Sequence, residues 1–221
     1  TLIERDAFNH CEKLEKVEFK GSIKSIEWGT FSRCESLTDV IFNCQIIKER
    51  VFDKCKALVR INLPESLLSI GNYAFNECES LEIVEIPTKV VYIGNYAFNK
   101  CISLEKMIIP ENVQSIGDSC FKNCSKLEKC ELSSSRKLQK IGDAAFSGCS
   151  KLRQIIIPSQ VASINYETFM DCNELMNVSI PASVKKIDES AFYNCFELTS
   201  IEIPSSVKFI KSQAFYGCKK L

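Results

Sequence analysis

The apolar residues of the chain recur in one fixed arrangement along almost its whole length. The pattern Phe-x-x-Cys-x-x-Leu occurs ten times, and the step between successive phenylalanines is 23 residues in seven of nine cases. An isoleucine stands five residues before each phenylalanine, and apolar residues follow nine and eleven residues after it wherever the chain extends that far. The phenylalanines are Phe8, Phe31, Phe52, Phe75, Phe98, Phe121, Phe146, Phe169, Phe192 and Phe215. This regularity predicts stacked repeat units over residues 1–221 and leaves no room for a separate domain or linker.

One unit, residues 81–101, shows the extended elements that the pattern predicts. Its first half alternates between apolar and polar positions, with Val84 and Ile86 on one side, which predicts a short strand with one buried face. Pro87 lacks the amide for the next ladder hydrogen bond, so the strand ends there. The apolar residues at 90–93 predict a second short extended segment.

The second half of the unit predicts a turn and a compact segment. Gly94 and Asn95 favour a change of chain direction. Residues 96–101 have the spacing of a single helical turn, with Ala97, Phe98 and Cys101 facing inward. A unit of this length cannot bury its apolar side chains alone, whereas stacked copies bury them against each other.

The consensus Leu-x-x-Val-x-Ile-Pro-x-x-Val-x-x-Ile-Gly-x-x-Ala-Phe-x-x-Cys resembles the BspA-type, or Treponema pallidum-type, leucine-rich repeat. The resemblance implies an α/β repeat solenoid: a right-handed superhelix with a parallel sheet on its concave face, and short strands and single helical turns elsewhere. It also implies display on the surface of bacteria or mucosal protist parasites, in adhesion and host-protein binding. The shortened unit around Cys44 and the lengthened one at residues 133–137 predict locally altered geometry.

The charge balance narrows the class of partner. The 28 Lys and Arg residues match the 28 Asp and Glu residues, so bulk electrostatics does not favour nucleic acid or an anionic membrane. No stretch approaches the ~18 consecutive apolar residues of a membrane span. We therefore expect a protein partner.

No residue pattern points to catalysis. The single histidine, His10, occupies a position that other repeats fill with Arg33, Glu77 or Gly148, which indicates an exposed turn. There is no Cys-x-x-Cys pair for zinc, no glycine-rich phosphate loop and no Gly-x-Ser-x-Gly elbow. We expect no catalytic residue, metal or cofactor, and a protein that is not an enzyme.

Ten of the 13 cysteines occupy one position, three residues after each phenylalanine. Stacked strands lie ~4.8 Å apart, and equivalent side chains point the same way. Their Cβ atoms are then farther apart than the ~3.5–4.5 Å that a disulfide prefers. Disulfides and a metal site are the alternatives, but we predict 13 free thiols, packed as small, weakly polar hydrophobes.

The outward residues of the predicted strands form the first candidate binding surface. They lie eight and ten residues after each phenylalanine and are mostly polar. Exposed isoleucines among charged residues can anchor a protein partner. The candidates are Ile41, Ile83, Ile108 and Ile156, with Lys106 and Glu85.

A second candidate surface lies near the C-terminal end. Met170, Tyr193 and Tyr216 share one position on three consecutive units, and Phe196 lies three residues beyond Tyr193. Such a column of large apolar residues predicts an exposed patch. The chain begins and ends within a repeat, and open solenoid ends expose core. We therefore expect a fragment of a longer protein, with about ten repeats, or ends that self-associate.

Two function classes remain. The first is a surface-displayed or secreted adhesin-like binding module, and the second is a cytoplasmic scaffold repeat, which reduced cysteines favour. Asn177 and Asn123 begin N-glycosylation sequons and are candidate modification sites in a secreted eukaryotic protein.

Overall fold

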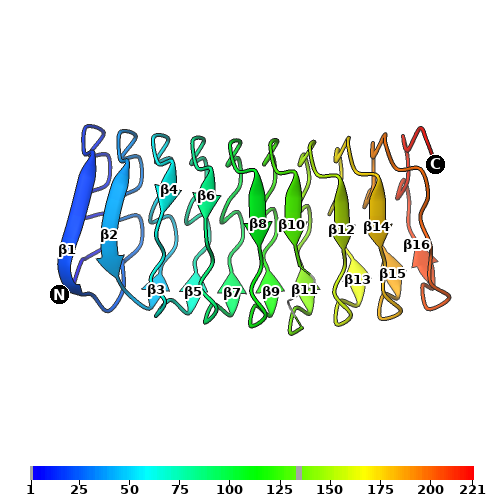
Figure 1. The fold of residues 1–221 in the computed structure, drawn as a ribbon, viewed down its shortest axis with the longest axis horizontal. Helices are drawn as coiled ribbons and strands as arrows, with labels where there is room; N and C mark the ends of the chain where they lie inside the picture. The colour runs from blue at the N-terminus through cyan, green and yellow to red at the C-terminus, as the bar shows by residue number, and fades with distance from the viewer. Residues whose placement is uncertain (1, 133–135) are drawn as a thin grey trace.

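The chain winds into a parallel β-solenoid in which each repeat forms one rung (Figure 1). The computed structural model describes residues 2–132 and 136–221. The predicted insertion at residues 133–137 lies partly outside this description. Strands of successive rungs stand side by side along the long axis of the molecule, so residues one repeat apart in sequence are neighbours in space.

Every rung contributes up to two short strands, which form two rows. The first row comes from the segment before the proline position, and its strands are β1 (Lys16–Ser22), β2 (Asp39–Asn43), β4 (Arg60–Ile61), β6 (Ile83–Val84), β8 (Lys106–Ile108), β10 (Lys129–Glu131), β12 (Gln154–Ile156) and β14 (Asn177–Ser179). Each strand of the second row ends at the isoleucine that stands five residues before a phenylalanine of the repeat pattern. These strands are β3 (Ile46–Ile47), β5 (Ser69–Ile70), β7 (Tyr92–Ile93), β9 (Ser115–Ile116), β11 (Lys140–Ile141), β13 (Ser163–Ile164), β15 (Lys186–Ile187) and β16 (Phe209–Ile210). Both extended segments predicted for residues 81–101 are therefore confirmed, as β6 and β7.

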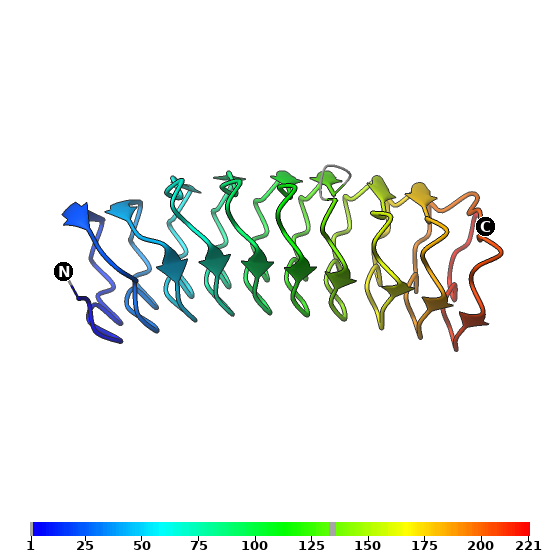
Figure 2. The ribbon, with the colours of Figure 1, turned by 90° about the horizontal axis from the view of Figure 1, so that it is seen from below.

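The two rows differ in how continuously they are hydrogen-bonded. In the second row, five strands from β3 to β11 form one sheet, and β13, β15 and β16 form another. In the first row, strands are bonded only in pairs: β1 with β2, β4 with β6, β8 with β10 and β12 with β14. Figure 2 shows the rungs spread more widely on the side of the first row than at the turns opposite. The first row thus lies on the outer side of a shallow arc, and its predicted place on a concave face is wrong.

The predicted single helical turn is also wrong, and with it the α/β class, since the described residues contain no helix. In every repeat the residues two before and two after the phenylalanine have a positive φ, for example Tyr96 at 56° and Lys100 at 57°. A right-handed helix requires negative φ throughout.

Backbone hydrogen bonding between rungs explains this conformation. The amides of Tyr96, Phe98 and Lys100 donate to carbonyls of the next rung at 2.8–2.9 Å. The amides of the residues between them donate three residues back within the same turn, as Asn99 does to Tyr96 at 3.2 Å. A helix would direct all of these amides along its own axis, so the alternating pattern extends the rung-to-rung ladder through the turn instead.

A stack of phenylalanine rings runs through the core. Successive rings from Phe8 to Phe215 lie 5.2–5.6 Å apart between centroids and within 14° of parallel. The eight inner rings are fully buried. Each such aromatic pair stabilises by about 0.5–1.5 kcal/mol beyond the burial of apolar area, which accounts for phenylalanine at this position in all ten repeats.

The cysteines form a second ladder beside the rings. From Cys34 to Cys218, each Sγ of the repeated position donates to the phenylalanine carbonyl of the preceding rung at 3.1–3.2 Å. All 13 cysteines are free, in agreement with the prediction, although Cys11 is exposed and Cys218 half-buried. Burial raises the pKa of Cys124 to about 12, so this thiol stays protonated at neutral pH.

Candidate functional site

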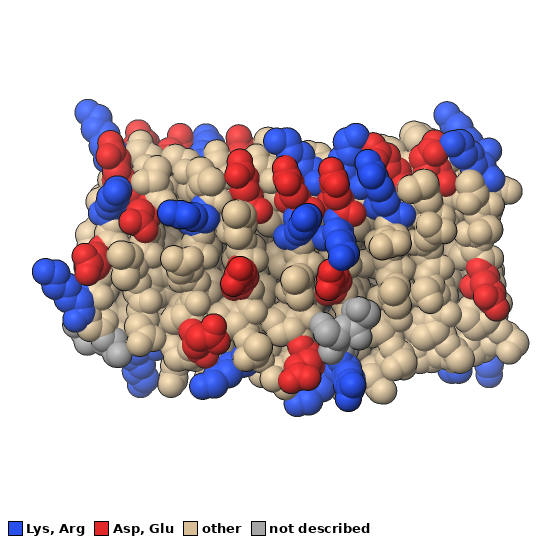
Figure 3. Space-filling view, in the orientation of Figure 1, with Lys and Arg blue, Asp and Glu red and all other residues tan. Residues whose placement is uncertain are grey.

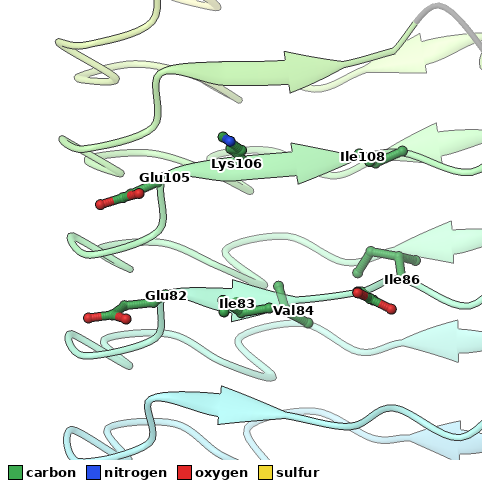
Figure 4. A pocket seen from close by; sticks show the side chains of 8 residues that line it. Glu82, Ile83, Val84, Ile86, Glu105, Lys106 and Ile108 are labelled. Atoms are coloured by element: carbon green, nitrogen blue, oxygen red, sulfur yellow. The ribbon is translucent and has the colours of Figure 1, made fainter.

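A shallow groove opens on the first strand row between β6 and β8 (Figure 4). It has a volume of about 510 Å³. Figure 4 shows that its side chains come from two neighbouring rungs, with Glu82 and Glu105 beside the beginnings of the two strands. Other hollows on the strand face have volumes of about 440, 330 and 190 Å³.

The groove lies where the hydrogen-bonded ladder of the first row is interrupted. β6 is paired with β4, and β8 is paired with β10, so the two strands belong to separate sheets. Adjacent strands that share a ladder are held about 4.8 Å apart. A hollow of about 440 Å³ also lies between the paired strands β4 and β6, so a break in the ladder is not required for such a depression.

The apolar walls of the groove are Ile83 and Ile108. Their exposed fractions are 59% and 58%, although they stand beside a well-packed core. The neighbouring residues Val84 and Ile86 alternate inward and are buried. Strand alternation therefore places two large apolar side chains in solvent, as the sequence predicted for this pair.

Carboxylates flank the isoleucines. Glu82, Glu85 and Glu105 line the groove together with a single ammonium group, that of Lys106. In the described part of the chain, none of these three carboxylates forms an ion pair or a side-chain hydrogen bond. Figure 3 shows charged side chains gathered over the middle of this face, whereas the area over β14 is nearly free of them.

The charges of the turns behave differently, because they pair from rung to rung. Lys100 binds Glu77 at 2.9 Å, and Lys56 binds Glu35 at 3.0 Å. Partial burial opposes ionisation of Glu77, but the hydrogen bond from Lys100 and the charge of Lys54 outweigh it and lower its pKa. The carboxylates of Glu82, Glu85 and Glu105 differ from these paired residues, but they share the lack of an ion pair with other described surface residues such as Asp39 and Glu202.

Glu82 and Glu105 were missed by the sequence interpretation, which counted only the positions eight and ten residues after each phenylalanine. These two residues lie seven after it, immediately before the strands, where period-two alternation has not yet begun. The sequence did contain a signal for these residues, because glutamate occupies the same position on three consecutive repeats, as Glu82, Glu105 and Glu128.

The other predicted residues of this face lie elsewhere. Ile41 is exposed in β2, opposite Glu18 of β1, two rungs away from the groove. Ile156 is exposed in β12 and lines a separate hollow of about 190 Å³ with Glu131. The structure therefore brings together Ile83, Ile108, Lys106 and Glu85, and it separates Ile41 and Ile156 from them.

The predicted C-terminal patch is only partly exposed. Tyr193 and Tyr216 stack at 5.0 Å between ring centroids, and Lys219 lies over the ring of Phe196 at 4.5 Å. Met170, Tyr193 and Phe196 are half-buried, whereas Tyr216 is 59% exposed. These residues belong to the turn side of the solenoid, remote from the strand face.

The two sequons differ in local structure. Asn177 and Ser179 are both exposed and project from the same side of β14. Asn123 is exposed in a turn with φ of 60°, and its amide donates to the Ser147 carbonyl at 2.7 Å. Both candidate acceptors are exposed, Asn177 on a strand and Asn123 in a turn.

Ordinary catalytic groups are not brought together. His10 is exposed, with Nδ1 3.9 Å from a Glu12 carboxylate oxygen. Within residues 2–132 and 136–221, no group of three or more His, Cys, Asp or Glu side chains is arranged to hold a metal ion. Burial raises the pKa of the inner thiols, including Cys101 and Cys149, and a protonated thiol is a poor nucleophile.

Comparison with known proteins settles the family. The family described as BspA type leucine rich repeat region, in six copies, matches residues 1–128, 42–152 and 91–221. The chain belongs to this family. The groove thus lies on the strand face of a BspA-type leucine-rich repeat protein, between its fourth and fifth repeats. No curated protein shows significant similarity to the chain.

Solved structures of bacterial leucine-rich repeat proteins share the fold. The T. pallidum leucine rich repeat protein is 30% identical, with a TM-score of 0.64 over 68% of this chain and 70% of that one. A leucine-rich repeat protein from Eubacterium ventriosum ATCC 27560 is 22% identical, with a TM-score of 0.68 over 97% and 80%. The pneumococcal vaccine antigen PcpA is 21% identical, with a TM-score of 0.55 over 95% and 59%.

BspA-type repeats are generally protein-interaction modules, and such repeat proteins are generally non-catalytic. In the part of this chain that the structure describes, no helix is long and apolar enough to cross a membrane.

Proposed function

We propose that this chain is a surface-displayed, adhesin-like module that binds a host or matrix protein through its first strand row. The observation that carries the proposal is the exposure of Ile83 and Ile108 on either side of one groove. Large apolar side chains in a depression, surrounded by polar residues, are typical anchors of protein interfaces. The BspA-type family supports the surface setting.

Binding to a panel of purified matrix proteins tests this function. The native chain, Ile83→Lys and Ile108→Lys are immobilised, and binding of each matrix protein is measured by surface plasmon resonance. We expect at least one protein to bind the native chain and to lose about tenfold or more in affinity with either variant, because each places a charge in an apolar contact. Undiminished binding in both variants would refute a role for this face.

A cytoplasmic scaffold repeat is the second candidate function. The thirteen free thiols favour it, because reducing compartments keep thiols unpaired. The ends of the intact gene distinguish the two candidates. A signal peptide or a membrane anchor supports surface display, whereas a gene that encodes neither supports the scaffold.

Glycosylation at Asn177 belongs to the surface-display proposal. A glycan there would cover the part of the strand face around β14 and leave the groove between β6 and β8, three rungs away, open. Mass spectrometry of the protein purified from its native source tests this: unmodified Asn177 would remove the proposal.

A further inference from the structure

We infer that the groove between β6 and β8 selects a partner segment in which a large apolar side chain is flanked by Lys or Arg residues. This inference rests on the proposed function and specifies the chemistry of the ligand at the same site. It follows from two features of the groove: its apolar walls and its unpaired carboxylates.

The apolar walls set the first requirement. Ile83 and Ile108 stand on adjacent rungs and are both more than half exposed. Burial of an exposed isoleucine side chain stabilises a complex, because its apolar surface is removed from water. A partner that covers both therefore needs a large aliphatic or aromatic side chain that reaches into the hollow.

The carboxylates set the second requirement. Glu82 and Glu105 lie beside the beginnings of the two strands. Glu85 follows Ile83 by two residues and also lines the groove, so acidic residues stand on both sides of Ile83 along the chain. On rungs four to six the strand face carries Glu82, Glu85, Glu105, Glu128 and Glu131 against Lys106 and Lys129. Lys129 is already engaged by Glu131 at 2.6 Å, which leaves the remaining surface acidic.

Charge complementarity decides between classes of partner. An acidic segment would place like charges beside Glu82 and Glu105, and close like charges across an interface cost affinity. A basic segment finds unpaired carboxylates that need break no existing ion pair. Because each solvent-exposed ion pair contributes little affinity, the charges determine which partner binds, and the isoleucines supply most of the binding energy.

Three fluorescein-labelled peptides test the inference by fluorescence anisotropy: Lys-Val-Lys-Phe-Lys-Val-Lys, its counterpart with every Lys replaced by Glu, and its counterpart with Val and Phe replaced by Ser. We expect the first peptide to bind at least tenfold more tightly than either of the others, and more weakly as salt is raised. Equal binding of the acidic peptide, equal binding of the serine peptide or no binding of the first peptide would overturn the inference.

Variants locate the site. The double variant Glu82→Gln, Glu105→Gln should weaken binding of the lysine peptide about three- to tenfold, and Ile83→Ser should weaken it further. The matched controls are Ile41→Ser and Glu202→Gln, which change an equally exposed isoleucine and an acidic residue of the same strand face outside the groove. Losses as large in the controls as in the groove variants would also overturn the inference.

The two proposals fail in different ways. A matrix protein that loses affinity with Ile83→Lys and Ile108→Lys, together with no preference for the lysine peptide, supports the proposed function and rejects the basic-apolar ligand. If the affinity for the matrix protein is unchanged in both Ile83→Lys and Ile108→Lys, the proposed function itself is rejected.

Discussion

One position of the repeat carries ten of the thirteen cysteines, and the structure gives it a chemical reason. Each thiol from Cys34 onward packs in the core and donates a hydrogen bond to the phenylalanine carbonyl one rung earlier. A cysteine is small enough for the tight stack, and its weak S–H donor reaches the second lone pair of a carbonyl that already accepts one amide hydrogen bond within its own turn. The spacing of the repeat predicted free thiols. It could not predict which carbonyl accepts the S–H hydrogen bond, because that depends on how one rung is positioned against the next.

Thiol titration checks this ladder. Burial raises the pKa of Cys101, Cys124 and their neighbours, so at pH 8 the native protein should react rapidly at the exposed Cys11 and slowly elsewhere. After denaturation without reductant, a colorimetric thiol assay should count close to 13. A count near three in the denatured protein would show that the ladder is oxidised and contradict the account.

Asp188 determines how the stability of the folded chain changes with pH in the acidic range. Partial burial opposes its ionisation, but hydrogen bonds from Lys186 and Lys211 outweigh this and lower its pKa. A carboxyl whose pKa is lower in the folded chain than its unfolded value of about 3.9 binds fewer protons when folded. Its stabilising contribution is therefore present above about pH 4 and lost as pH falls below that value.

The variant Asp188→Asn should lower the free energy of unfolding by about 0.5–1 kcal/mol at pH 7, and by less at pH 2, where the pH approaches the lowered pKa of the folded carboxyl. Urea unfolding at both pH values measures the difference. The control is Asp39→Asn, an exposed strand residue with no ion pair in the described chain. An Asp188→Asn effect of equal size at both pH values would exclude the ion pairs as its cause.

At the scale of elements, close approach of rungs limits what the turns accept. Gly94 lies against the preceding rung, where an added Cβ would stand 2.6 Å from the backbone nitrogen of Asn72. A Cβ added at Gly21, in β1, would have no neighbouring atom within 4 Å. A Cβ added at Gly94 would therefore clash with backbone, whereas one added at Gly21 would meet open space.

Gly94→Ala should destabilise the chain by about 1–3 kcal/mol, because the methyl group forces two backbones apart. Gly21→Ala, the matched control, should change stability by no more than about 0.5 kcal/mol. Chemical denaturation followed by circular dichroism measures both. Equal effects at the two positions would mean that rung spacing tolerates the extra atom.

The elements also show how far the sequence could predict the fold. Alternation and the proline located β6 and β7, because side-chain direction in a strand depends only on parity. The inward spacing of Ala97, Phe98 and Cys101 was interpreted as a helical turn, yet it is equally compatible with a turn that contains left-handed residues. Spacing does not report the sign of φ, and here hydrogen bonds to the next rung decide it.

At the scale of the whole molecule, the candidate site lies between two strands of the first row that are not hydrogen-bonded to each other. The same parity that located the strands placed Ile83 and Ile108 outward, so this half of the site was predictable. The groove itself lies between β6 and β8, which are not hydrogen-bonded to each other, and it includes Glu82 and Glu105 just before the strands. Neither follows from a repeat pattern that is nearly identical on every rung.

The affinity of a matrix protein from the panel for matched isoleucine variants tests the central claim most directly. With the dissociation constant measured for the native chain, Ile83→Lys and Ile41→Lys, the account predicts a tenfold or greater loss for Ile83→Lys, about 1.4 kcal/mol or more. It predicts less than a twofold change for Ile41→Lys, on the same face and equally exposed. Equal losses in the two variants, or no loss in either, would contradict recognition through the groove.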